Sequence, residues 1–125
     1  MGEDYALLSG RVIGESNMAM AYRAMGNVKE ALDHSERAVK LLESCGQTEV
    51  QEEEIFFNHY LVLQDNKKPD EANDYLKRAL DKMMSKAGNI KDSVTREIFL
   101  KRVSINGSIN SAWKEQTPVN PSGTA

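Results

Sequence analysis

The sequence has few of the residues that define several common protein classes. Cys45 is the only cysteine among 125 residues, so the chain cannot form an internal disulfide. His34 and His59 are the only histidines, too few with one thiol to predict a zinc site. The chain has three prolines and no apolar run long enough to cross a membrane. We therefore expect a protein that is neither collagen-like nor membrane-bound, in the cytoplasm.

A large excess of one charge is also missing. The 16 basic and 19 acidic residues give a net charge of −3, which argues against a general nucleic-acid binder. Residues 1–66 carry 12 acidic and 5 basic side chains, whereas residues 67–125 carry 7 and 11. This asymmetry has two interpretations. Either the helices expose faces of differing sign to solvent, or the two ends favour head-to-tail contact or a charged partner.

Catalytic motifs are absent too: there is no glycine-rich phosphate loop, no HExxH and no GxSxG. Residues 34–36 (His-Ser-Glu) have the residue types of a triad, but neighbouring side chains on a helix point about 100° apart. His59 is expected to be a packing histidine. Residues 52–54 (Glu-Glu-Glu) are interpreted as first-turn acids that the helix dipole favours. We expect neither an enzyme nor a bound metal or cofactor.

Helical periodicity, in contrast, is abundant. Apolar residues recur at spacings of three and four, and no polar–apolar alternation typical of strands competes. The pattern predicts an all-α chain of five to six helices, at about 3–25, 28–44, 49–65, 69–87, 92–103 and 104–114. Residues 117–125 are predicted to form a flexible tail.

An internal repeat relates the second and fourth predicted helices. Ala31 and Ala38 follow the same pattern as Ala72 and Ala79, 41 positions later. Alanines let two antiparallel helices approach closely, and helix pairs repeating at such a period predict a solenoid. The predicted domain covers residues 1–116. Its parts are units at about 3–46 and 48–88 and a C-terminal helical cap at about 92–115.

Residues 15–43 carry a recognisable motif, made of Met18-Ala19, Tyr22, Gly26-Asn27, Glu30-Ala31 and Ala38. On these residues the chain resembles a tetratricopeptide repeat protein of a long-repeat type. The resemblance implies a solenoid of antiparallel helix pairs that acts in protein–protein interaction. The second unit departs from the motif, with Tyr60 in the place of Ala19 and Lys67 in the place of the turn glycine. The C-terminal third is similar to the end of repeat regions in large bacterial signalling proteins.

The concave groove of such an array is lined by the first helix of each pair. The groove residues expected from the first and third helices are Ile13, Ser16, Asn17, Met20, Arg23, Ala24, Glu54, Phe57, Asn58, Leu61 and Gln64. We predict that Asn17, Met20, Arg23, Phe57, Asn58 and Leu61 bind the partner. This surface suits an extended peptide or an amphipathic helix, with Phe57 as its anchor.

Three alternatives stay open. The chain is either an interaction module, free-standing or within a larger signalling protein, or a regulatory domain that senses a peptide or small molecule. The groove is either open or filled by the fifth and sixth helices. Finally, Tyr5, Leu8 and Val12 on the first helix need a cover, which a homodimer or a neighbouring repeat would supply.

Overall fold

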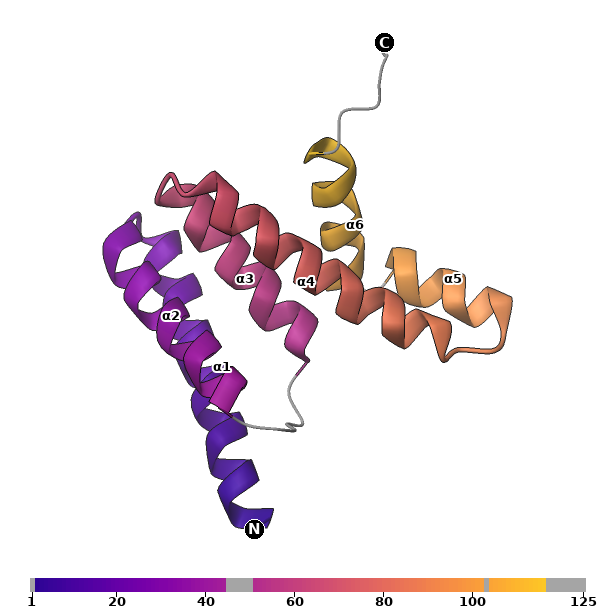
Figure 1. The fold of residues 1–125 in the computed structure, drawn as a ribbon, viewed down its shortest axis with the longest axis horizontal. Helices are drawn as coiled ribbons and strands as arrows, with labels where there is room; N and C mark the ends of the chain where they lie inside the picture. The colour runs from indigo at the N-terminus through magenta and orange to yellow at the C-terminus, as the bar shows by residue number, and fades with distance from the viewer. Residues whose placement is uncertain (1, 45–50, 103, 117–125) are drawn as a thin grey trace.

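The structure, a computed structural model, describes residues 2–44, 51–102 and 104–116. The predicted tail at 117–125 lies outside these residues. The described residues form six helices and no strand, so the all-α prediction is confirmed (Figure 1). The helices are α1 (Gly2–Ala24), α2 (Val28–Ser44), α3 (Glu52–Asp65), α4 (Pro69–Gly88), α5 (Ser93–Arg102) and α6 (Ser104–Gln116).

The turn that joins α1 to α2 recurs between α3 and α4. Gly26 has a left-handed backbone with φ 80°, and the amide of Asn27 bonds to the carbonyl of Tyr22 at 2.9 Å. In the second turn, 41 residues later, Lys67 has φ 59° and the amide of Lys68 bonds to the carbonyl of Leu63 at 3.0 Å. Both turns therefore end a helix in the same way, although only the first has the glycine that this conformation favours.

Each turn produces a hairpin of two packed helices, α1–α2 and α3–α4 (Figure 1). The small residues at the contacts are almost completely buried, as the repeat predicts: Ala31, Ala38, Ala72 and Ala79. The period of 41 residues is thus a structural repeat of two helical hairpins.

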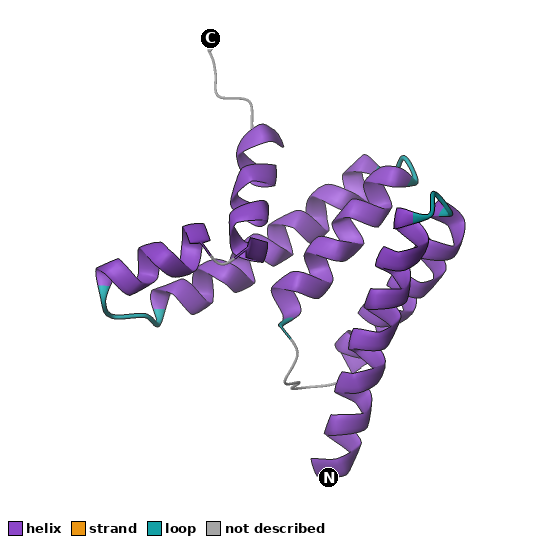
Figure 2. Ribbon diagram, turned by 180° about the vertical axis from the view of Figure 1, so that it is seen from behind, coloured by secondary structure: helices purple, strands orange, loops and turns teal. Residues whose placement is uncertain are grey.

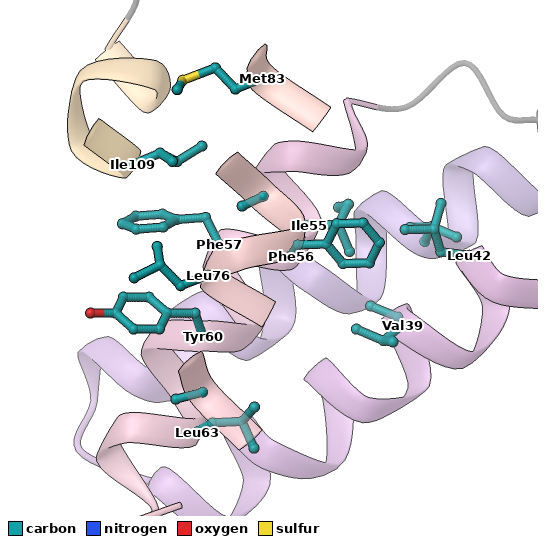
Figure 3. Close-up of a cluster of buried hydrophobic side chains, with 14 residues drawn as sticks. Val39, Leu42, Ile55, Phe56, Phe57, Tyr60, Leu63, Leu76, Met83 and Ile109 are labelled. Atoms are coloured by element: carbon teal, nitrogen blue, oxygen red, sulfur yellow. The ribbon is translucent and has the colours of Figure 1, made fainter. Parts of the chain in front are cut away.

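The core surrounds α3, which packs against α1, α2 and α4. A helix that is apolar on most of its circumference must be covered by neighbours on several sides. The main core cluster joins α3 to α2 and α4 (Figure 3). It contains Phe56, Phe57, Tyr60 and Leu63 from α3, Leu76 and Met83 from α4, and Val39 and Leu42 from α2. The start of α3 at Glu52 is later than predicted, and the side chain of Gln51 makes no capping hydrogen bond.

The last two helices cover one side of the second hairpin. The carboxylate of Asp92 accepts hydrogen bonds from the amide and the hydroxyl of Thr95, at 2.8 and 2.6 Å, so Asp92 caps the start of α5. In α6, Ile109 is fully buried in the same cluster as Phe57 and Met83 (Figure 3). The face of α3–α4 that points away from the first hairpin is therefore covered by α6.

The exposed side of α1 is not the one that the sequence predicts. Val12 is fully buried in the core and Leu8 is half-buried, because this side of α1 packs on the rest of the fold. The side chain of Tyr5 lies outside the described residues. Leu7, Met18 and Met25 are exposed instead. Both ribbon views show the N-terminal turns of α1 extending beyond the end of α2 (Figure 2).

Candidate functional site

A cleft lies between α1 and α3, the first helices of the two hairpins. Its volume is about 230 Å³, and its walls are Ile13, Ser16, Asn17, Gln51, Glu54, Ile55 and Asn58. Five of these seven residues belong to the groove predicted from the sequence. The repeat therefore places its first helices side by side, with their expected faces on one cleft.

The chemistry of the cleft is mixed. Ile13 and Ile55 supply apolar surface, and the exposed Glu54 adds one carboxylate. Asn17 and Asn58 occupy equivalent positions of the two units, 41 residues apart. Such amide side chains both donate and accept hydrogen bonds, as a peptide backbone requires of its partner.

The orientation of one amide is fixed by a buried hydrogen bond. Nδ2 of Asn58 donates to the hydroxyl of Ser16 at 3.0 Å, and this bond joins α3 to α1 at the base of the cleft. The residues that hold the two hairpins together therefore also shape the cleft.

Three other predicted partner residues lie outside the cleft walls. Nε of Arg23 donates to the carboxylate of Asp65 at 2.6 Å, where the C-terminal ends of α1 and α3 meet. This ion pair neutralises much of the charge of Arg23. Met20 is partly buried against a small cluster around Val62, and Leu61 is partly buried against the main core. These side chains keep some exposed surface at the edge of α1 and α3.

Phe57 lies in the core and not on an open groove surface. It is 7% exposed, its ring packs on Tyr60 with centroids 5.4 Å apart, and Ile109 of α6 lies beside it (Figure 3). It therefore cannot be the accessible anchor that the sequence predicts. The alternative of a filled groove holds for this part of α3, because α6 covers it, whereas the cleft beside α1 is open.

Gln51 and Ile55 are cleft residues that the sequence reasoning missed. Gln51 directly precedes α3, and its side chain makes no capping hydrogen bond to that helix. The signal that could have found Ile55 is the repeat itself, since Asn58 is one helical turn away on the same face.

A buried polar pair joins the two hairpins next to the cleft. The hydroxyl of Ser35 and Nδ1 of His59 are 2.6 Å apart, and the two residues are 2% and 4% exposed. The ring of His59 packs edge-on against Tyr75, with centroids 4.5 Å apart. Burial lowers the pKa of His59 to about 4, an effect that Glu43 opposes and Arg78 reinforces. The prediction of a packing histidine is confirmed.

The triad-like run at 34–36 is divided between different neighbours. His34 bonds to Glu15 of α1 at 2.6 Å and stacks on Tyr22, while Ser35 turns to His59 of α3. The geometry of Ser35 and His59 is that of a nucleophile and a base, but a substrate would have no access to this buried pair. Its role in the fold is to hold α2 and α3 in register.

The acidic run at the start of α3 forms ion pairs with α4. Glu53 is buried, and its two carboxylate oxygens accept from Lys86 at 2.7 and 2.8 Å. Glu52 lies 3.3 Å from Lys82.

Within the described ranges, no group of three or more histidine, cysteine or acidic side chains could hold a metal ion. None of the helices that the structure describes is long and apolar enough to span a membrane.

A second and wider cleft lies between α4, α5 and α6. Its volume is about 640 Å³, and it is lined by Met84, Leu100, Gly107, Ser108, Asn110, Ser111 and Lys114. Its lining residues come from α4, α5 and α6, and none of them belongs to the predicted groove.

Comparison with known families bears on the first hairpin. A model of the tetratricopeptide repeat matches residues 16–44, from the middle of α1 to the end of α2. No curated protein and no solved structure gives a significant match. Tetratricopeptide repeats generally mediate protein–protein interactions. The chain therefore has a tetratricopeptide-like helical repeat fold in which one segment, residues 16–44, matches the repeat itself.

Proposed function

We propose that this chain is a protein-interaction module that binds an extended peptide in the cleft between α1 and α3. The observation that carries the proposal is the pair Asn17 and Asn58, which the repeat places on opposite walls of one cleft. Asn17 is exposed and can both donate to and accept from a peptide backbone, whereas Nδ2 of the mostly buried Asn58 is bonded to Ser16, so Asn58 fixes the opposite wall.

The size of the cleft favours a peptide over a small molecule. Pockets for drug-sized ligands are typically about 300–1,000 Å³, and this cleft is smaller, at about 230 Å³. Such a volume accommodates one large side chain while the rest of the peptide lies along the surface. Ile13 and Ile55 make an apolar side chain the best occupant.

The negative charge of the cleft favours a basic residue next to the apolar anchor of the peptide. Among the residues that the structure describes, Glu54 is the only carboxylate on the cleft wall, and it is exposed. The acidic balance of residues 1–66 acts in the same direction. The proposed ligand is therefore a peptide with an apolar anchor and a lysine or arginine close to it.

A screen of a random displayed peptide library against the whole chain tests this proposal. The expected result is enrichment of peptides with an apolar residue next to a basic one. Their affinity should fall roughly tenfold or more in the variants Ile13→Glu and Glu54→Lys. Met84→Glu, on the other cleft, is the control and should bind as the unchanged chain does. Equal binding by Glu54→Lys would overturn the proposal.

The alternative function, a regulatory domain that senses a small molecule, is favoured by one observation. The cleft between α4, α5 and α6 has a volume of about 640 Å³, within the usual range for such ligands. A metabolite library screened by thermal shift distinguishes the two functions. A hit that Met84→Glu abolishes and Glu54→Lys leaves unchanged would favour sensing. The cytoplasmic location and the place in a signalling protein stay predictions.

A further inference from the structure

Two asparagines of α6 join this helix to the end of α5. Because α5 ends at Arg102, the carbonyls of its last turn have no partner within the helix. Nδ2 of Asn106 donates to the carbonyl of Phe99 at 2.9 Å. Nδ2 of Asn110 donates to the carbonyl of Leu100 at 3.0 Å. These bonds fix α6 against α5, so the cleft between α4, α5 and α6 is built into the fold.

The wall that α4 and α5 contribute to this cleft is apolar. It consists of Met84 of α4 and Leu100 of α5, and Met84 is 49% exposed. A methionine side chain is flexible and polarizable, so it adapts to apolar groups of different shapes. On α6, Gly107 lines the cleft without a side chain, which lets a ligand approach the helix backbone. This part of the cleft suits an aliphatic chain.

The wall that α6 contributes is polar and carries one positive charge. Ser108, Ser111 and Lys114 line it at intervals of three residues, and all three are exposed. Their two hydroxyls and the ammonium group can all donate hydrogen bonds to an anion. None of the described residues that line the cleft is acidic, and Lys114 forms no ion pair with another described residue. A ligand can therefore supply the counter-charge.

The charge and size of the cleft indicate the class of ligand. One ammonium group balances one negative charge, and a carboxylate has two oxygens that can accept from Lys114 and from a neighbouring hydroxyl. Gly107 and Lys114 lie seven residues apart, about 10 Å along the axis of α6. The bond from Asn110 to Leu100 places the apolar wall towards the Gly107 end. The volume of about 640 Å³ is sufficient for a ligand that spans both ends.

We propose that the cleft between α4, α5 and α6 binds a monocarboxylic acid with an aliphatic chain. The carboxylate lies on Lys114, and the chain lies between Met84 and Leu100. This proposal rests on the second candidate function, the sensing of a small molecule. It is independent of the peptide proposed for the cleft between α1 and α3, because the two clefts share no residue.

Titration calorimetry of the full chain with three ligands of equal chain length tests the proposal. Octanoate should bind saturably at submillimolar concentration, at least about tenfold more tightly than 1-octanol or octylamine. Trp113 is the only tryptophan and precedes Lys114 on α6, so its fluorescence should change with the same midpoint. Equal affinities for the acid and the alcohol would overturn the proposal, as would a failure of octanoate to bind.

A charge-removing variant and a matched control place the carboxylate. Lys114→Gln should weaken octanoate at least about tenfold and leave 1-octanol unchanged, because only the acid uses the ammonium group. Lys77→Gln removes an exposed lysine of α4 that does not line the cleft, and it should bind octanoate as the unchanged chain does. Circular dichroism should show both variants folded. The same octanoate affinity in both variants would overturn the proposal.

Met84→Glu separates a wrong ligand class from a wrong site. It places a carboxylate on the apolar wall and should weaken octanoate binding at least about tenfold. If 1-octanol or octylamine binds, is lost in Met84→Glu, and octanoate does not bind, the site for a small molecule stands and the carboxylate assignment fails. If none of the three ligands binds and no compound of the metabolite screen depends on Met84, the sensing function fails with it.

Discussion

Nδ1 of His59 lies 2.6 Å from the hydroxyl oxygen of Ser35, and this contact joins α3 to α2 inside the protein. Because burial lowers the pKa of His59 from 6.5 to about 4, the ring is neutral in the folded chain at neutral pH. In the unfolded chain the same ring takes up a proton near pH 6.5. The stability of the fold is thereby linked to pH.

The free energy of unfolding should fall as the pH is lowered from about 6.5 to 4. Between these values the unfolded chain binds the proton and the folded chain does not, so acid favours unfolding. The contribution of His59 is fully present above pH 6.5, and its loss by pH 4 is roughly 3 kcal/mol. Urea unfolding at a series of pH values measures it. His59→Gln keeps a hydrogen-bonding partner for Ser35 and should flatten this slope. An unchanged slope in that variant would show that other groups cause the dependence.

Lys67→Gly should stabilise the fold. Lys67 has a left-handed backbone with φ 59°, which costs a residue with a side chain roughly 1–2 kcal/mol, and glycine avoids this cost. Greater freedom of glycine in the unfolded chain offsets part of the gain, which leaves about 0.5–1 kcal/mol. The midpoint of urea unfolding should rise. The reverse change, Gly26→Lys, should lower it by a similar amount, and a loss of stability in Lys67→Gly would contradict the argument.

Phe57→Ala should destabilise the fold by about 3–5 kcal/mol, as expected for the loss of a buried aromatic ring. The ring lies between α3, α4 and α6, so its removal leaves a cavity in the main core (Figure 3). The exposed Met84→Ala is the control and should change stability by less than about 0.5 kcal/mol. Equal stability of the two variants would place Phe57 on the surface after all.

The pair Glu53 and Lys86 should behave as a coupled unit. The Glu53 side chain is 3% exposed and its carboxylate accepts two bonds from Lys86, which reaches solvent. Lys86→Met leaves a buried carboxylate without its hydrogen-bond donor and should cost about 1–3 kcal/mol at pH 7. Adding Glu53→Met should recover the loss to within about 1 kcal/mol. A double-mutant cycle measured by urea unfolding checks the coupling, and a doubly changed chain as unstable as Lys86→Met would refute it.

Features set by local spacing could be predicted from the sequence. Most helix boundaries, though not the start of α3, follow from patterns within a few turns of chain, as do the turn at Gly26, the cap at Asp92 and the buried alanines. The cleft between the first helices of the two units follows from the repeat. The cleft residues Asn17 and Asn58 could therefore be predicted from the sequence.

Features set by contacts distant in sequence could not be predicted in this way. Spacing pairs Arg78 with Asp74, but its hydrogen bond goes to Glu43 at 2.8 Å, 35 residues away. The guanidinium also lies 4.8 Å from the ring centre of Tyr75. The burial of Phe57 depends likewise on where α6 docks. Helical periodicity describes one helix at a time, and it does not say which neighbour will cover a face.

The position of α6 determines at which side of the fold a further helical hairpin could pack. Any hairpin added after the second unit must first displace Ile109 from the core, whereas a hairpin added before α1 meets an uncovered face. An engineered chain could therefore be lengthened at its N-terminal side without dismantling existing packing. A hairpin packed on the opposite side would have to compete with α6 for the surface around Phe57 and Leu76.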